Sequence, residues 1–320
     1  MIKKGAIRRI LVASIALILV VVALYIFPEN EVKIPTKTIH KKVNTSGVYL
    51  IDHNNYVART YININNKDKE KMARELKEAL INGTNKNKYL PNGFSSYINN
   101  NAKINNIVIE DDLVQIDFND SLFLNNQDHD EKILEMIVYT LTEIEGIKRV
   151  QILINGEILD RLPSSNKILP LYLTRDIGIN HKSLISDFKN TKNVTIYFKS
   201  TYEDLDYFVP VTFTLNSEEE KVEIIINQLS GKDYIDDNLS TYISAGTLLK
   251  NYQILEDEIS LDFNNVIFNG FDKIDEEVMY GISLSIYDNY NISNVSFEVD
   301  SKKIDSYALK KSWLCSKVII

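Results

Sequence analysis

The residues of this chain that could do chemistry include four clustered aspartates, Asp111, Asp112, Asp117 and Asp120. Carboxylates at such spacing can bind a divalent cation or act as general acid and base. However, the phrase VQIDFND around Asp117 returns as ISLDFNN around Asp262. A fold constrains both copies of a duplicated phrase, whereas a duplicated site usually decays in one copy. We therefore predict structural roles: Asp111-Asp112 forms a hairpin turn, Asp117 lies on a solvated sheet face, and Asn119 and Asp120 end the strand.

The other metal-binding and nucleophilic residue types are sparse. The four histidines are His40, His53, His129 and His181. None has a second ligand at a metal-binding spacing, and the Asp-His-Asp-Glu run at Asp128 fits an acidic first turn of a helix. Cys315 is the only cysteine, which rules out an internal disulfide. No G-x-S-x-G, P-loop or G-x-G-x-x-G motif occurs. We predict no catalytic, cofactor-binding or metal site and no cofactor, and we assign no binding residue.

The N-terminus predicts a membrane anchor. Residues 10–27 carry no charge over eighteen positions, which is close to the minimum for a membrane-spanning helix. Four cations precede this run, so residues 1–9 should stay in the cytoplasm and the rest should lie outside the cell membrane. A cleavable signal peptide is the alternative, but its apolar region is shorter and ends in a small-x-small site, which Leu24 to Phe27 does not offer.

The exported part of the chain is acidic. After the four N-terminal cations it holds 32 basic residues against 44 acidic ones. A surface of that sign repels phosphate backbones and anionic lipid headgroups, so nucleic acid is excluded as an expected partner. The hydrophobic content of 44% is typical of a globular protein with ample core.

The chain contains a divergent internal duplication. An offset of 145 positions aligns Asp117-Phe118-Asn119 with Asp262-Phe263-Asn264 and, without a gap, Tyr97 with Tyr242 and Val150 with Val295. Upstream the offset drifts, but Val48-Tyr49-Leu50 still resembles Ile196-Tyr197-Phe198. The duplication predicts two copies of one fold, with Phe118 and Phe263 both buried at equivalent strand ends.

Each copy has the same predicted element order. In the first, Val48–Ile51 and Tyr56–Ile64 read as strands, Asp68 to Leu80 as a helix, and Ile104–Glu110 with Leu113–Phe118 as a hairpin. A second helix from Asp130 to Glu145 carries an apolar stripe, and alternating residues from Val150 lead into the turn Asn155-Gly156. The prediction is an α+β fold: two tandem ββαββαββ units with helices packed on a sheet, behind one N-terminal transmembrane helix.

The predicted boundaries follow from these elements. We expect a cytoplasmic tail at residues 1–9, an anchor at 10–27 and a linker at 28–47. Domain 1 should span residues 48–159, a connector 160–193, domain 2 194–304 and a C-terminal tail 305–320. The connector holds two prolines, and its length predicts that part of it docks on a domain. The tail carries the sole tryptophan, Trp313, and either docks on domain 2 or engages a partner.

The repeated unit resembles the GerMN domain of GerM-like sporulation and germination proteins. Members of that family show an hxhDFs strand end and a following helix like hVyTLTphpGVkrVphlhdG, which residues 133–159 match closely as ILEMIVYTLTEIEGIKRVQILINGEIL. The second copy keeps LDFNN and ISNVSFEVD but has Asn291 in place of Gly146. This chain lacks the lipid-bearing cysteine of the well-known members, and similar domains also occur in lipoproteins of bacteria that do not sporulate.

The resemblance implies a non-enzymatic envelope protein of sporulation or spore germination. It would be a membrane-anchored scaffold or channel-assembly protein whose partners are other membrane or envelope proteins, with homo-oligomers possible because the domain also resembles ring-forming modules. The alternative is an extracytoplasmic binding module that captures a cell-wall or peptide ligand and regulates an envelope enzyme. A concave pocket lined by aromatic residues would favour that alternative, whereas exposed sheet edges or complementary charged faces would favour assembly.

Overall fold

The element order matches the sequence-based prediction in both copies. A computed structural model describes residues 45–86, 90–124, 126–231, 236–268, 270 and 272–309. The first repeat comprises β1 (Thr45–Ile51), β2 (Val57–Asn63), α2 (Lys69–Leu80), β3 (Ile104–Glu110), β4 (Leu113–Phe118), α3 (Asp130–Leu141), β5 (Arg149–Ile154) and β6 (Glu157–Ile158). The second comprises β8 (Thr191–Tyr202), β9 (Leu205–Asn216), α4 (Lys221–Gly231), β10 (Leu249–Ile254), β11 (Glu258–Phe263), α5 (Glu276–Tyr290), β12 (Asn294–Val299) and β13 (Lys302–Ala308). The order ββαββαββ is therefore confirmed.

The described strands do not form one sheet per repeat but three sheets in all. Each repeat has a four-stranded sheet, ordered β3-β4-β5-β6 or β10-β11-β12-β13, in which the central pair is parallel. The hairpins β1–β2 and β8–β9 lie outside these sheets and join in a third, through a bridge between Arg59 and Phe208. The expectation of helices on one face of a single sheet was wrong in this respect.

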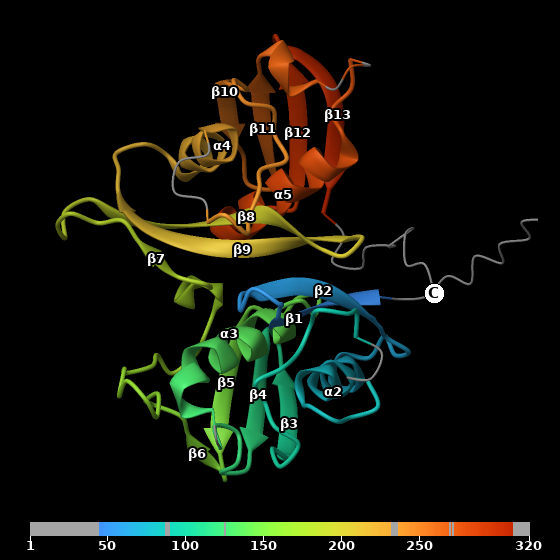
Figure 1. Ribbon diagram of the computed structural model, residues 1–320, viewed down its shortest axis with the longest axis vertical. Helices are drawn as coiled ribbons and strands as arrows, with labels where there is room; N and C mark the ends of the chain where they lie inside the picture. The colour runs from blue at the N-terminus through green and yellow to red at the C-terminus, as the bar shows by residue number, and fades with distance from the viewer. Residues whose placement is uncertain are drawn as a thin grey trace, which may run out of the picture. The chain divides into compact units, whose positions relative to one another are not determined.

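The helices of each repeat lie between two layers of strands, which explains their burial. Figure 1 shows α4 and α5 between the β8–β9 hairpin and the sheet that ends in β13, and α2 and α3 in the matching place in the first repeat. All residues of α3 from Ile133 to Leu141 are buried, beyond the single stripe that we predicted. Apolar contact on both sides of a helix removes the solvated face that a surface helix keeps.

Local sequence signals end several elements where expected, although α3 ends at Leu141 and not at Glu145 as we predicted. Asp68 caps α2 by accepting a hydrogen bond from the backbone N–H of Lys71 at 3.1 Å. Asn155 and Gly156 both have positive φ, 51° and 85°, as a two-residue hairpin turn of type I′ requires. The predicted register is also confirmed, because Phe118 and Phe263 end equivalent strands and are 1% and 0% exposed.

The connector docks on the first repeat. Leu173 bridges Val150 through two backbone hydrogen bonds of 2.8 Å, and Leu162, Leu169 and Ile179 are buried in the first hydrophobic core. A short strand, β7 (Lys182–Ser183), then pairs with β9. At the other end of the chain, β13 runs through Ala308, past the boundary at residue 304 that we expected.

The predicted membrane anchor at residues 10–27 lies outside the described residues, as do the linker up to residue 44 and the tail from residue 310. Within the described part, no helix is both long and apolar enough to span a membrane.

Candidate functional site

The repeated aspartates hold turns in place. An oxygen of the Asp117 carboxylate accepts a hydrogen bond from the backbone N–H of Gly156 at 2.9 Å, in the turn between β5 and β6. Asp262 accepts from the N–H of Ser301 at 3.0 Å, in the turn between β12 and β13. The two acceptors and the two donors each differ by the same 145 positions, so both carboxylates do one structural task.

The asparagines of the repeated phrase fix the loop before the sheet. Asn119 accepts from the N–H of Lys103 at 2.9 Å and donates to the carbonyl of Asn101 at 3.0 Å. Asn264 makes the equivalent pair of bonds, to Leu248 at 3.1 Å and to Gly246 at 3.0 Å. Side-chain-to-backbone bonds of this kind are the strand-end role that we predicted for Asn119, and they hold the loop upstream of the strand pair.

The remaining predicted acids are dispersed. Asp111 sits in the β3–β4 turn with φ of 54°, Asp112 pairs with Arg149 at 2.5 Å, and Asp120 contacts Ser121. The hydrogen bond from Arg149 lowers the pKa of Asp112. Among the described residues, no group of three or more His, Cys, Asp or Glu side chains is placed to hold a metal ion.

The described histidines make separate local contacts. His129 stacks on Tyr97 with ring centres 4.0 Å apart, His53 approaches the hydroxyl of Tyr207, and His181 hydrogen-bonds the carbonyl of Ile177 at 2.7 Å. His40 lies outside the described residues. Thus, none of these three histidine rings lies together with another histidine of the described residues.

A buried polar cluster at the contact between the repeats links charged groups of both repeats and of the connector. Arg175, from the connector, donates to Glu143 at 2.7 Å and to Asp288 at 2.5 Å. These two acids are equivalent by the 145-residue offset. The hydroxyls of Tyr49 and Tyr197, which our alignment also equates, lie 2.8 Å apart between them. Pairs of equivalent residues that meet one another mark a local two-fold relation, which makes the contact isologous.

A second arginine completes this cluster. Arg59 in β2 pairs with Glu143 at 2.7 Å and donates to the hydroxyl of Tyr280 at 2.6 Å. Gly47 makes room for this pair, because a Cβ there would lie 2.5 Å from a carboxylate oxygen of Glu143. Two guanidinium groups therefore face two carboxylates, Glu143 and Asp288, and the charges balance.

Burial and neighbouring charges shift the pKa of the tyrosines and of Arg175 in this cluster. Burial raises the pKa of Tyr49 and Tyr197, so both remain neutral phenols. Burial opposes the charge of Arg175, but Asp288 and its other neighbours outweigh that effect and raise its pKa. Both tyrosine hydroxyls and the Arg175 guanidinium group therefore keep their protons at neutral pH.

The sequence reading missed this cluster. Glu143 and Asp288 share the repeat offset, as do the residues that bond the tyrosine backbones, Thr140 at 2.9 Å and Ser285 at 3.0 Å. That shared acidic position was an available signal. Arg175 gave none, because it lies in the unrepeated connector.

Asn180, in the connector, links the two repeats by a second set of hydrogen bonds. Its side chain exchanges two hydrogen bonds with the backbone of Val57, at 2.9 and 2.8 Å, and donates to the carbonyl of Pro210 at 2.7 Å. Its backbone N–H donates to the carboxyl group of Glu135 at 3.2 Å. Burial raises the pKa of Glu135 to about 8, so this carboxyl group is mainly protonated at neutral pH.

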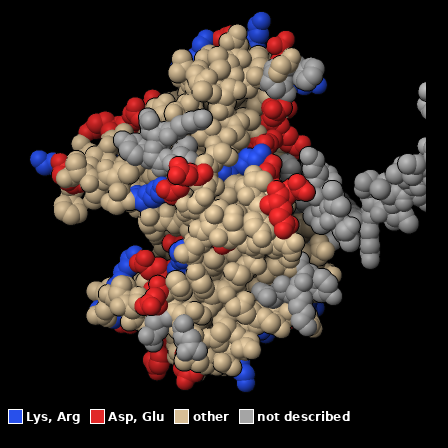
Figure 2. All heavy atoms as spheres, in the orientation of Figure 1, with Lys and Arg blue, Asp and Glu red and all other residues tan. Residues whose placement is uncertain are grey.

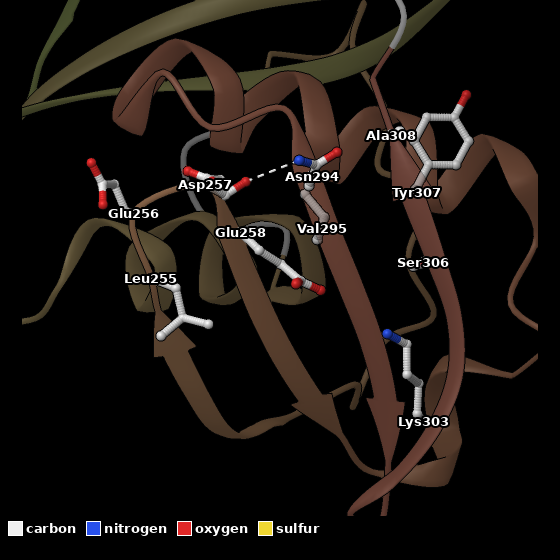
Figure 3. Close-up of a pocket in the computed structure, with 10 residues that line it drawn as sticks. All are labelled: Leu255, Glu256, Asp257, Glu258, Asn294, Val295, Lys303, Ser306, Tyr307 and Ala308. Atoms are coloured by element: carbon white, nitrogen blue, oxygen red, sulfur yellow. Dashed lines mark hydrogen bonds between the residues drawn. The ribbon is translucent and has the colours of Figure 1, made fainter.

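A hollow of about 550 Å³ lies on the second repeat, beside the β10–β11 turn and the β12–β13 pair. In Figure 3 the side chains of Glu258 and Lys303 point toward one another across it, and the amide of Asn294 donates to the carbonyl of Asp257 at 3.1 Å. Tyr307 is the one aromatic residue of the lining. The hollow is therefore polar, not the aromatic-lined pocket that would favour ligand capture.

The surface carries no broad basic area on the face shown in Figure 2, where lysines and arginines alternate with acidic side chains. Phosphate recognition needs clustered cations. The exclusion of nucleic acid as a partner stays a prediction from the net charge.

Comparisons with known proteins identify the repeats. The sequence model of the Germane family, described as sporulation and spore germination, matches residues 47–160 and 195–305. The spore germination protein GerM of Bacillus subtilis (strain 168) is 29% identical over 262 residues, which cover 80% of this chain and 71% of that protein. The solved structure of the tandem GerMN domains of the sporulation protein GerM from Bacillus subtilis has a TM-score of 0.76 at 26% identity, covering 84% of this chain and 98% of that one.

Proposed function

Because this chain belongs to the Germane family of sporulation and spore germination proteins, we propose that it is a non-enzymatic scaffold. It is anchored in the cell membrane by residues 10–27 and holds its two repeats outside the cytoplasm. There it assembles other membrane or envelope proteins during sporulation or spore germination.

The observation that carries this proposal is how the fold uses its acidic groups. Asp117 and Asp262 hold hairpin turns, and Glu143 and Asp288 neutralise buried arginines. Acid–base chemistry needs a carboxylate that can reach a substrate, and these four have backbone or guanidinium partners instead. The four positions form two pairs that are related by the repeat offset, as expected for residues with a structural role in a duplicated unit.

Exposed sheet edges supply the surface for assembly. β3 and β10 each form one edge of a four-stranded sheet, and β13 forms the far edge in the second repeat. Lys302 and Lys303 are exposed on β13, and edge lysines disfavour indiscriminate pairing of strands. A partner must therefore match both the strand and its charges, over roughly 1,200–2,000 Å² in total for a stable contact.

The alternative function, capture of a cell-wall or peptide ligand, draws on the hollow beside Glu258. Its volume falls within the range of about 300–1,000 Å³ that is usual for ligand sites. Its polar lining with a single aromatic residue favours a solvated surface over a ligand pocket, which ranks this function second.

Complementation of a null strain tests the scaffold. Deleting residues 194–309, or replacing residues 48–159 with an unrelated domain, should abolish heat-resistant spore formation or germination. Lys302→Glu should impair it by altering the β13 edge, because Lys302 is exposed there and does not line the hollow. A Glu258→Gln variant, in the hollow, is the matched control and should retain function. Normal function without one repeat, at normal protein level, would disprove assembly by the tandem unit; loss in Glu258→Gln alone would favour ligand capture.

A further inference from the structure

An apolar groove lies between α3 and the connector. Its volume is about 250 Å³, and its walls include Leu134 of α3 and Leu162, Leu169 and Ile177 of the connector. Two large apolar side chains of the connector line it and remain exposed, Ile168 at 69% and Tyr172 at 38%. Apolar side chains clustered around a hollow indicate a contact surface, whereas single exposed ones do not.

The polar groups of the groove have an acidic excess. Glu131 and Asp176 line it against one lysine, Lys167, while the buried and mainly protonated Glu135 adds no charge. Lys167 already pairs with Glu131 at 3.2 Å, and one oxygen of the buried Glu135 carboxyl group accepts from Asn180. The lining therefore suits an apolar group that carries an N–H donor and is followed or preceded by cations.

The size of the groove selects the class of occupant. Sites for small molecules usually enclose about 300–1,000 Å³. A smaller groove with an exposed apolar rim fits one anchoring side chain of a peptide segment, and tryptophan is enriched among such anchors.

One segment of this chain has that chemistry. Residues 310–320, outside the described residues, read KKSWLCSKVII: they contain the sole tryptophan, three lysines, and no aspartate or glutamate. Trp313 supplies an apolar ring with an N–H donor, and Lys310 and Lys311 precede it.

We propose that the groove receives residues 310–320 of a second copy of this chain, with Trp313 as the anchoring side chain. Leu309, the last described residue before this segment, packs against Tyr280 and Leu284 of the second repeat, and its N–H donates to the carbonyl of Ser293 at 2.8 Å. Trp313 follows four residues later, so it reaches at most about 14 Å from there. The groove belongs to α3 and the connector of the first repeat, and a neighbouring copy reaches it without that limit.

A contact of this kind is heterologous, since the tail of one copy occupies the groove of the next. Heterologous contacts build rings when the rotation closes and open filaments when it does not. The inference rests on the proposed scaffold function and gives it a mode of self-association.

Photo-cross-linking of the full chain in its host membrane tests this contact. Benzoylphenylalanine replaces Trp313, and cells co-express copies with two different epitope tags. We expect cross-linked pairs that carry both tags, with the linked peptide mapping to residues 162–177. Cross-links confined to one copy, or to other residues, would overturn the proposal.

Two sets of variants make the assignment specific. Ile168→Asp with Tyr172→Asp should reduce the cross-linked pair at least tenfold, about 1.4 kcal/mol of contact free energy. Phe188→Asp is the matched control, because Phe188 is 92% exposed on the same connector but outside the groove, and it should leave the yield unchanged. Equal cross-linking yields from the groove variant and from Phe188→Asp would refute the groove as the binding site of residues 310–320. Because the readout is a covalent pair, it can fail while spore complementation still supports the scaffold.

Discussion

Glu143 and Asp288 occupy equivalent positions in the two repeats, and the guanidinium group of Arg175 donates hydrogen bonds to both carboxylates. The connector thus contributes the charge that lets two acidic copies of one surface face each other. Without it, Asp288 would have no cation in this buried contact and Glu143 would keep only Arg59.

Removing that guanidinium group should destabilise the protein strongly. Arg175→Ala leaves Asp288 without its cation and Glu143 with only Arg59, and breaking a buried pair costs about 3–5 kcal/mol. Lys167→Ala is the control, because its pair with Glu131 is exposed and should contribute less than about 1 kcal/mol. Urea unfolding measures both; equal effects would contradict a central role for Arg175.

The repeated phenylalanines should be equally important to their cores. Phe118→Ala and Phe263→Ala should each reduce the free energy of unfolding by about 3–5 kcal/mol, because each ring is fully buried. Phe188→Ala removes a ring that is 92% exposed and should change stability by less than about 0.5 kcal/mol. A small effect at either buried position would show that the register of the repeats is wrong.

The repeated aspartates should be dispensable for activity. Asp117→Asn and Asp262→Asn keep an oxygen that can accept from Gly156 or Ser301, so the fold should tolerate them at a cost of about 1 kcal/mol each. Complementation should be normal wherever the protein level is normal. A stable, abundant and inactive asparagine variant would reveal a carboxylate site.

Glu135 should make stability depend on pH. Burial raises its pKa from 4.5 to about 8 in the folded state, so the folded protein binds a proton that the unfolded chain releases between these values. The contribution of Glu135 is therefore fully present below about pH 4.5 and is lost as the pH rises toward 8, at about 1.4 kcal/mol per pKa unit.

Glu135→Gln removes that titration and should flatten the stability profile between these pH values. Chemical denaturation at a series of pH values, compared with Glu131→Gln on the exposed part of the same helix, measures the difference. Parallel profiles for the wild type and Glu135→Gln would show that the carboxyl group does not titrate in this range.

Several features of the fold could be predicted from the sequence alone because they depend on local chemistry. The positive φ values of Asn155 and Gly156 and the cap at Asp68 follow from residue type. The duplication followed from the fixed offset, and it predicted correctly that Phe118 and Phe263 are buried at equivalent strand ends. The family resemblance rested on the same repeated sequence motifs.

Other features were decided by contacts between segments far apart in the chain. The apolar stripe predicted one buried face for α3, but sandwiching between hairpin and sheet buries the whole middle of that helix, including Glu135. The hairpins pair across the repeats, and Arg175 meets Glu143 and Asp288 over 32 and 113 positions of sequence. Periodicity reports only which side of an element is apolar. Which second surface covers the other side, and which charge balances a buried acid there, is determined by the packing of the whole chain.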